Sequence, residues 1–513
     1  MGSEPLAPDD LAAITGEAIR IEDAEPAFRA SLPHSEALPI VLSLLCNLFL
    51  TALDQTIVAT ALPTIGVQFN DVSNLSWVIT AYLLASTAVA PVYGALADIY
   101  GRRAMIITAN VLFLIGSVLC ALAPNLLFLI LARGLQGLGG GGILPLVQTL
   151  IADVVTPRDR GRYQGYISMV WVTAGIGGPV LGGVFAQHLH WSMIFWINLP
   201  IGVGSLMLLL PRLRKVPDFH RHRKLDWTGG LLLMISAVVF LLALTWGGHK
   251  FAWLSPTILG MIGSAVVLMA AFVIHARTTE EPFLPLPLIS GPVVPFSMVA
   301  GGSAMGTMIA MIVHLPIYYE AVYRLSASEA GIALIPLVAV SVLGAWSAGQ
   351  FMAVTGRYKW VAFGGASVAA TCLMLMAYLA APPLWVLLSL LAVLALGIGT
   401  CFPISVVSIQ NAVPRAQVGT ATGAMNFFRS LMSSFAVAVF TAILLAAIGQ
   451  DIPIGEGASG AVANVASADM ITGFRFVFLA AGSLMTMAAV LFALMEERPL
   501  AGGKPSPAAT MAE

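Results

Sequence analysis

Charged side chains are scarce in this sequence: Asp, Glu, Lys and Arg make up only 10% of its 513 residues, whereas 58% are hydrophobic. A soluble domain carries about 25% charged residues, so the chain lacks the polar surface that it would need to stay in water. With 24 basic and 25 acidic residues the net charge is -1, which gives no indication of nucleic-acid binding. The composition predicts an integral membrane protein.

Cysteine is also rare. Its four copies, Cys46, Cys120, Cys372 and Cys401, lie in apolar runs without paired spacing, so we expect neither a disulfide framework nor a metal site.

The glycines at 139–142 lie inside an apolar run with no Lys-Ser/Thr pair after them, so they do not form a phosphate-binding loop. No cofactor is expected. The chain has neither the nucleophile and base of a membrane enzyme nor the soluble output domain of a sensor.

Long apolar runs make up most of the chain. Counted as stretches of 18 or more residues between Gly, Pro and charged positions, they predict fourteen transmembrane segments. These segments must be helical, because only a helix satisfies its own backbone hydrogen bonds in hydrocarbon and barrel strands would be about 10 residues long. The expected fold class is therefore an all-α polytopic membrane protein.

The basic residues predict the orientation of these helices. If both termini are cytosolic, the inner segments hold 19 of the 24 basic residues and the outer segments hold only Lys250 and Arg324. This asymmetry is what the positive-inside rule requires. The first 35 residues are polar and acidic and lack the basic start and apolar core of a signal peptide, so we expect this tail to stay in the cytosol.

An internal repeat predicts two related halves. The segment Gly94–Arg103 (GALADIYGRR) is echoed at Gly349–Lys359 (GQFMAVTGRYK), an offset of 255 residues, and a second echo at Pro157 and Pro414 has an offset of 257. Weak parallel repeats of this kind are typical of transporters whose substrate site lies between the halves. The expected organisation is a cytosolic tail at 1–37, six-helix bundles at 38–211 and 293–494, a basic cytosolic loop with two inserted helices at 212–292, and a cytosolic tail at 495–513.

Asp54 is the most informative residue, because it lies deep within the first apolar run, at 38–58. A charged side chain at the bilayer centre costs at least about 2.5 to 3.5 kcal/mol. Asn47, Thr51 and Asp54 share one helix face by their i, i+4, i+7 spacing. Asp54 is either a carboxylate paired permanently for packing or a protonatable group that exchanges a proton for substrate, since burial disfavours the charged form.

Two arginines also lie within apolar runs. Arg133 is the nearest intramembrane cation to Asp54 in the first half, with Gln136 on the same helix face. It either donates to helix carbonyls or tunes Asp54, because a guanidinium does not lose its proton. Arg429, in the thirteenth run, either pairs across the two halves or lines the cavity.

The candidates for lining a substrate cavity are Asn47, Thr51 and Gln136 in the first half and Tyr318, Glu320, Phe428 and Arg429 in the second. Glu320, near Tyr318 and Arg324, is either a solvated carboxylate at the outer boundary, pairing with Arg324, or a second acidic group that recruits a cationic substrate. Most aromatics in the runs belong to the core or face lipid, but Phe428 is a candidate for a cavity that accepts apolar compounds, since flexible and aromatic surfaces suit promiscuous binding.

A glycine-rich stretch in the fifth run, AGIGGPVLGG at Ala174–Gly183, predicts a tightly packed hinge. Small residues allow helices to approach closely and proline interrupts the hydrogen-bond ladder. The residues concerned are Gly178, Pro179, Gly182 and Gly183.

Taken together, these motifs resemble the major facilitator superfamily, in its fourteen-span drug:proton antiporter branch of the EmrB/QacA type. The resemblance covers the first half and the start of the insertion. It rests on LDQTIVATALPTIG (Leu53–Gly66), GALADIYGRR, LARGLQGLGGGG around Arg133, AGIGGPVLGG, FWINLPIG (Phe195–Gly202) and KLDWTGG (Lys224–Gly230).

The resemblance implies a major facilitator fold of two six-helix bundles plus two inserted helices. It also implies a cytoplasmic latch that stabilises the outward-facing state. The latch residues are Gly94, Asp98, Gly101, Arg102 and Arg103, with Asp153 as the partner of the arginines. In the second half Ala353 occupies the place of Asp98, so we expect the latch to be asymmetric. The sequence departs from the family pattern at Ala174, at Ser192 and at Glu320, where relatives often have Gly, Arg and Gln.

The resemblance implies a proton-coupled exporter of amphipathic, cationic or lipophilic compounds that works by alternating access. Asp54 would couple proton movement to transport, and Arg133 would tune Asp54 or the proton path. The protein would act as a monomer in the inner or plasma membrane, with a periplasmic adaptor as a partner by family analogy only. The alternatives are an exporter of one endogenous metabolite, lipid or siderophore on the same fold, or a non-transporting sensor.

Overall fold

The computed structural model describes residues 34–71, 74–214, 216, 224–248, 250–379, 381–448 and 467–500. These residues contain fourteen helices that are long and apolar enough to cross a membrane, as predicted. In chain order the elements are α2 (His34–Phe69), α3 (Ser76–Tyr100), α4 (Arg102–Ala121), α5 (Leu126–Val154), α6 (Pro157–His188), α7 (Met193–Trp196) continued by α8 (Asn198–Leu213), α9 (Trp227–Trp246), α10 (Pro256–Thr278), η2 (Leu286–Ile289), α11 (Val294–Tyr323), α12 (Ala327–Ala333) continued by α13 (Ile335–Thr355), α14 (Lys359–Leu379), α15 (Leu384–Ala412), η3 (Arg415–Gln417), α16 (Val418–Ile448) and α18 (Ser467–Leu494).

The helix boundaries lie close to the expected domain limits. The helix α2 begins at His34, inside the segment 1–37 that was expected to be a tail, and α8 ends at Leu213 rather than at 211. The helix α18 ends at Leu494, the expected end of the second half. Residues 1–33 and 501–513, and much of the basic loop after 214, lie outside the described residues.

Capping residues set several of the helix starts. The side chain of Asn125 accepts a hydrogen bond from the backbone N–H of Phe128 and begins α5. Thr156 does the same for Asp159 at the start of α6, where Pro157 occupies the first turn. These side chains satisfy N–H groups that have no partner within the helix, and proline at the first position has no N–H to satisfy. Local sequence therefore places these helix ends independently of tertiary packing.

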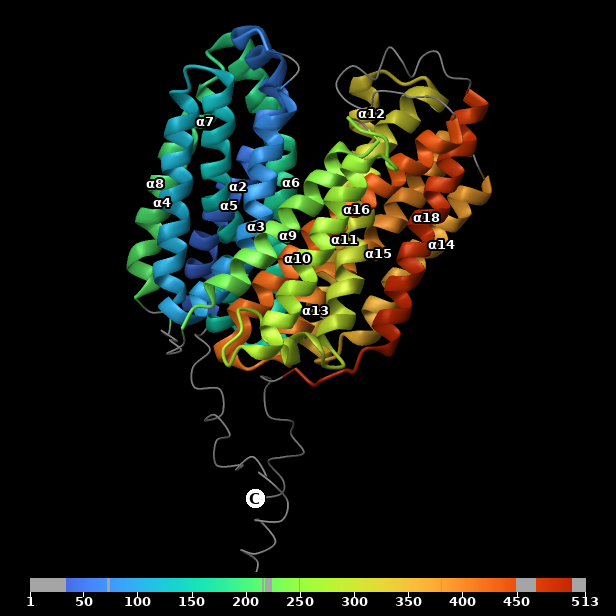
Figure 1. Cartoon of the computed structure of the whole chain (residues 1–513). Coiled ribbons are helices and arrows are strands. Elements are labelled where there is room, and N and C mark those ends of the chain that lie inside the picture. The colour runs from blue at the N-terminus through green and yellow to red at the C-terminus, as the bar shows by residue number, and fades with distance from the viewer. Residues whose placement is uncertain are drawn as a thin grey trace, which may run out of the picture.

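The helices form two halves that diverge toward one end (Figure 1). The first half runs from α2 to α8 and the second from α11 to α18, and the two touch mainly where α3 packs on α16 and α6 packs on α13. The inserted pair, α9 and α10, pack on each other, and α9 also contacts α3 and α16 at the side of this junction. We call the end where the halves meet the closed end; it holds the start of α2 and the end of α18 (Figure 1).

Glycines allow the two halves to approach at backbone distance. A Cβ atom on Gly94 of α3 would lie 2.4 Å from the carbonyl oxygen of Gly419 in α16, and one on Gly349 of α13 would lie 2.3 Å from that of Gly161 in α6. Both distances are far below van der Waals contact, so any larger residue would separate the helices. The two crossings occupy equivalent places in the internal repeat.

Candidate functional site

Asp54 lies in the interior of the first half, on α2, with a side chain that is completely buried. Its Oδ2 accepts a hydrogen bond from Nη1 of Arg133 at 2.6 Å. Its Oδ1 accepts from Nε2 of Gln136 at 2.8 Å and from Nδ2 of Asn198 at 2.9 Å. Three helices, α2, α5 and α8, thus meet at one carboxylate whose charge is compensated and whose two oxygens are hydrogen-bonded.

A second shell of contacts holds these donors in place. The Ser117 hydroxyl of α4 accepts from Gln136 at 2.9 Å and from Asn198 at 2.8 Å. The guanidinium of Arg133 donates from Nε to the carbonyl of Val78 at 3.1 Å and lies 4.3 Å from the ring centre of Tyr82. Arg133 thus donates both to a helix carbonyl and to Asp54.

Sequence reasoning missed Asn198 and Ser117. Asn198 lies within the FWINLPIG motif, which was noted only for its resemblance, and an amide in an apolar run was the available signal. Asn47 and Thr51 lie on the same helix as Asp54 but do not join its network. The Asn47 Oδ1 accepts from Ser205 of α8 at 2.9 Å, and the Thr51 hydroxyl donates to the carbonyl of Leu48 at 3.0 Å.

Asp98 joins the two halves at the closed end. Its carboxylate, 5% exposed, accepts hydrogen bonds from the backbone N–H of Gly419 at 3.1 Å and of Thr420 at 2.7 Å, and from the Thr420 hydroxyl at 2.8 Å. These groups belong to the first turn of α16, where the helix has free N–H donors and a positive dipole end. Asp98 thus caps a helix of the other half.

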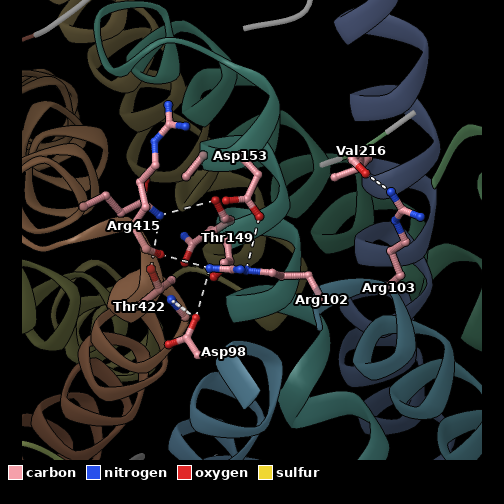
Figure 2. A network of polar contacts seen from close by, with 12 residues as sticks. Asp98, Arg102, Arg103, Thr149, Asp153, Val216, Arg415 and Thr422 are labelled. Atoms are coloured by element: carbon pink, nitrogen blue, oxygen red, sulfur yellow. Dashed lines mark hydrogen bonds and ion pairs between the residues drawn. The ribbon is translucent and has the colours of Figure 1, made fainter. Parts of the chain in front are cut away.

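Arg102 connects this cap to further groups (Figure 2). It donates from Nη2 to Asp98 at 3.1 Å and to the carbonyl of Arg415 in η3 at 3.0 Å, and its Nε lies 3.3 Å from Oδ2 of Asp153. The φ of Gly101 is 88°, a left-handed value that suits glycine in the turn between α3 and α4.

Arg103 does not point into this cluster. It donates instead to the backbone carbonyl of Val216, on the far side of the α4 start (Figure 2). The expectation that both arginines share Asp153 is corrected accordingly, because neighbouring positions on a helix point about 100° apart. Of the two, Arg102 reaches Asp153.

At the second crossing, the contacts between the described residues involve no carboxylate. Arg158, at the start of α6, donates from Nε to the carbonyl of Ala353 at 2.6 Å and from Nη2 to the carbonyl of Val354. Ala353 occupies the position equivalent to Asp98 and offers only a backbone oxygen at the C-terminal end of α13. The two crossings are therefore chemically different, which is the expected asymmetry.

The glycines of the predicted hinge do not all act alike. A Cβ on Gly178 would lie 2.0 Å from the hydroxyl oxygen of Thr56, and one on Gly182 would lie 2.1 Å from that of Thr60, so both press α6 against α2. Gly183 faces open space, with no atom within 4 Å of such a Cβ. The helix α6 continues across Pro179.

The substrate candidates of the second half lie apart from one another. Tyr318 is completely buried, with its ring centre 4.7 Å from that of Phe474 and 5.4 Å from that of Phe478. It packs in the core between α11 and α18, so the expectation that it lines a cavity is corrected. Glu320 is partly exposed near the end of α11, and Phe428 is partly buried on α16.

Arg429 lies on α16 and is 9% exposed. It donates from Nη2 to the carbonyl of Phe402 at 3.0 Å and to the Ser405 hydroxyl, both on α15. The expectation that it pairs with a residue of the other half is not met among the described residues, since both acceptors belong to its own half.

Comparison with known proteins gives consistent results. The sequence model of the family described as the Major Facilitator Superfamily matches residues 44–437. The chain is 35% identical over 442 residues to the efflux pump FUS6 of Gibberella fujikuroi, covering 82% of this chain and 79% of that protein. It is 31% identical over 411 residues to the multidrug transporter protein MdtP of Bacillus subtilis, covering 80% and 76%.

Solved structures support the same fold. The human organic anion transporter MFSD10 superimposes with a TM-score of 0.63 at 14% identity, covering 90% of this chain and 100% of that one. The proton:xylose symporter XylE gives a TM-score of 0.60 at 16% identity, covering 91% and 98%. At this level of identity the likeness shows the fold alone, and that fold is the expected one.

Proposed function

The chain belongs to the Major Facilitator Superfamily, a family of membrane transporters rather than enzymes, and from this premise we propose that it is a proton-coupled efflux pump. Relatives at 31 to 35% identity carry the names efflux pump and multidrug transporter, which supports export as the direction. The proposed substrates are amphipathic small molecules, for which the sequence favours cationic or lipophilic compounds. Two six-helix halves in one chain provide a complete transport unit, so we expect a monomer.

The observation that carries this proposal is the buried network around Asp54. A carboxylate at this depth in the membrane is costly unless it is paired or functional. Its ion pair with Arg133 joins α2 to α5, and the hydrogen bond from Asn198 adds α8. A proton bound to Asp54 would remove the countercharge of Arg133, which loosens the pair because a buried guanidinium without a partner is strongly unfavourable. Protonation would thus change the packing of three helices at once.

The arrangement of the two halves indicates which state of the transport cycle the structure represents. By the positive-inside rule the closed end, with Arg102, Arg103 and Arg158, faces the cytosol, and we expect both termini to be cytosolic. The divergence of the halves then faces outward (Figure 1). We infer an outward-facing state in which the latch residues Asp98 and Arg102 hold the inner end shut.

The proposed cycle follows from these contacts. A proton enters from the outside and binds Asp54 as substrate leaves, the latch opens, and the proton is released inward when a new substrate is bound. For an uncharged substrate, a membrane potential of 100 mV supplies about 2.3 kcal/mol per proton, enough to sustain a gradient of tens-fold, whereas exchange of one proton for one monovalent cation is driven by the pH difference alone. The inner or plasma membrane is the expected location, and a periplasmic adaptor is a partner by analogy alone.

Transport in proteoliposomes under an imposed pH gradient tests this function. Wild type should move a fluorescent lipophilic cation such as ethidium against its gradient, and Asp54→Asn should lose this dependence on the pH gradient. Glu496→Gln is a matched control, because that side chain is 53% exposed and pairs with Arg498 at the surface. Wild-type transport that ignores the pH gradient, or an unimpaired Asp54→Asn, would contradict proton coupling.

A further inference from the structure

Arg429 lies at mid-membrane depth in the second half. It is eleven residues from the start of α16 at Val418, a rise of about 16 Å along the helix. Since the hydrocarbon core of a bilayer is about 30 Å thick, its guanidinium lies far from either aqueous boundary along the helix axis. Only 9% of the residue is exposed.

The guanidinium has no negatively charged partner among the described residues. Its two hydrogen bonds, to the carbonyl of Phe402 and the hydroxyl of Ser405, both come from Nη2 and both go to neutral oxygens. Its Nε is buried and makes no hydrogen bond within the described part of the chain. A guanidinium has five N–H donors, so the three on Nε and Nη1 have no such bond.

Two other buried arginines, Arg133 and Arg102, have the acidic partner that Arg429 lacks among the described residues. Arg133 has the carboxylate of Asp54 at 2.6 Å, and Arg102 has carboxylate oxygens of Asp98 at 3.1 Å and Asp153 at 3.3 Å. Buried charges in proteins are as a rule paired, and arginine cannot escape the cost by losing its proton. Arg429 differs from both in lacking an acidic partner among the described residues, and an anion that binds beside it would supply the countercharge.

Arg429 lies close to the junction of the two halves. One turn earlier on the same face of α16, Asn426 donates from Nδ2 to the side-chain oxygen of Gln148 in α5 at 2.7 Å. This contact crosses from one half to the other. Since α16 begins at the closed end, Arg429 lies one turn further from that end than this contact.

The facing helix α11 approaches this group closely at a glycine. A Cβ on Gly301 would lie 2.7 Å from the hydroxyl oxygen of Ser405 and 3.8 Å from Nε of Arg429, so a larger residue there would press on the contact between Ser405 and the guanidinium. Next to it, Gly302 faces Met432 and Phe428, whose apolar side chains lie on either side of Arg429 in the sequence of α16. A cation edged by apolar groups matches an amphipathic molecule with an anionic head.

We propose that Arg429 binds an anionic group, a carboxylate in the simplest case, of the transported compound. This inference rests on the proposed export function and refines its substrate class: amphiphiles that carry an acidic group are substrates, in addition to the cationic or lipophilic compounds expected from the sequence. The N–H groups of Nε and Nη1 donate to the anion, and charge-assisted hydrogen bonds of this kind are among the strong ones in proteins.

A matched pair of fluorescent probes tests this subsite by direct binding. Dansylaminoundecanoic acid and its methyl ester differ only in the charge of the head group, and both can be titrated into the purified protein in nanodiscs. Wild type should bind the acid more tightly than the ester. Arg429→Gln should weaken the affinity for the acid by about 10- to 100-fold and leave the affinity for the ester unchanged. Arg429→Lys, which keeps a positive charge, should retain part of the preference for the acid.

Arg475→Gln is the control, because it removes the same charge from an exposed position on α18 and should change neither affinity. An equal loss for acid and ester in Arg429→Gln, or no loss for either, overturns the proposal. Should that variant fold poorly, an Arg429→Lys protein without preference for the acid overturns it as well. Binding that discriminates the acid without transport of any probe would instead contradict the proposed export and leave the subsite standing.

Discussion

The carboxylate of Asp98 accepts the backbone N–H of Thr420 at 2.7 Å and the hydroxyl of the same residue at 2.8 Å. A side chain of the first half thereby caps a helix of the second. Because this cap is made across the junction, it exists only while the closed end stays closed. Opening that end exposes both the carboxylate and the helix N-terminus, and each must then form hydrogen bonds with water instead.

Neutralising this cap should shift the population of states. We predict that Asp98→Asn weakens the closed end by about 1 to 2 kcal/mol, since the amide keeps the shape but loses the charge that favours a helix N-terminus. The population of the inward-facing state should rise about 5- to 30-fold. Spin labels at Val67 and Ile332, near the outer ends of the two halves, with Cys46 replaced by Ser, would report the change as a shorter distance. An unchanged distance distribution would count against the capping role.

Adding a methyl group at the glycine crossings should separate the halves. Gly94→Ala and Gly349→Ala place a Cβ within 2.4 Å of a backbone oxygen, so we predict a loss of about 1 to 3 kcal/mol in the stability of the closed end and impaired export. Gly183→Ala is the matched control, because a Cβ there meets no atom within 4 Å. Thermal unfolding and transport of all three variants would show the difference, and similar behaviour of Gly94→Ala and the control would refute it.

Asn198 should contribute to both the stability of the protein and its pH-driven export. Asn198→Ala removes one of the two donors to Oδ1 of Asp54 in a dry interior, and we predict a destabilisation of about 1 to 3 kcal/mol with loss of pH-driven export. Ser117→Ala offers a graded comparison, because Ser117 contacts Asp54 only through Gln136 and Asn198. Its effect on export should be smaller. The reverse order in transport assays would show that the network is organised around Ser117.

The inserted helices should lose stability in acid through Asp226, the residue before α9. Burial alone would raise the pKa of this carboxyl group, but hydrogen bonds from the N–H groups of Gly229 and Phe283 and from His275 outweigh it and hold the pKa below its ordinary value. The stabilisation is therefore present above the ordinary pKa of about 3.9 and is lost as the pH falls through the lower, folded value.

We accordingly predict that Asp226→Asn lowers the melting temperature at pH 7 and that the difference from wild type shrinks below about pH 4. Thermal unfolding of both proteins from pH 3.5 to 7.5 is the measurement. Glu496→Gln, at an exposed surface pair, should follow wild type throughout. A difference that is constant over this range would exclude the charge of Asp226 as its origin.

Particular residues show where sequence reasoning was sufficient and where it was not. Asp54 and Arg133 could be singled out because each is a charge in an apolar run, and the structure brings them together at 2.6 Å. Asn198 could not, because a neutral amide gives a weak signal and its contact spans 144 residues of sequence. Tyr318 was misplaced, since an aromatic in an apolar run can face a core, a cavity or lipid with the same local pattern.

The sequence by itself determined the fourteen helices and their number, because in a membrane each helix must satisfy its own backbone hydrogen bonds and hydrophobicity along the chain is enough to mark it. Only the tertiary structure decided which charges are paired. Asp98 caps α16, Arg102 reaches Asp153 while Arg103 does not, and in the described part of the chain Arg429 meets only neutral oxygens. Pairing depends on how helices from distant parts of the chain are rotated and packed against each other, and hydrophobic periodicity does not encode that rotation for helices that are apolar on nearly every face.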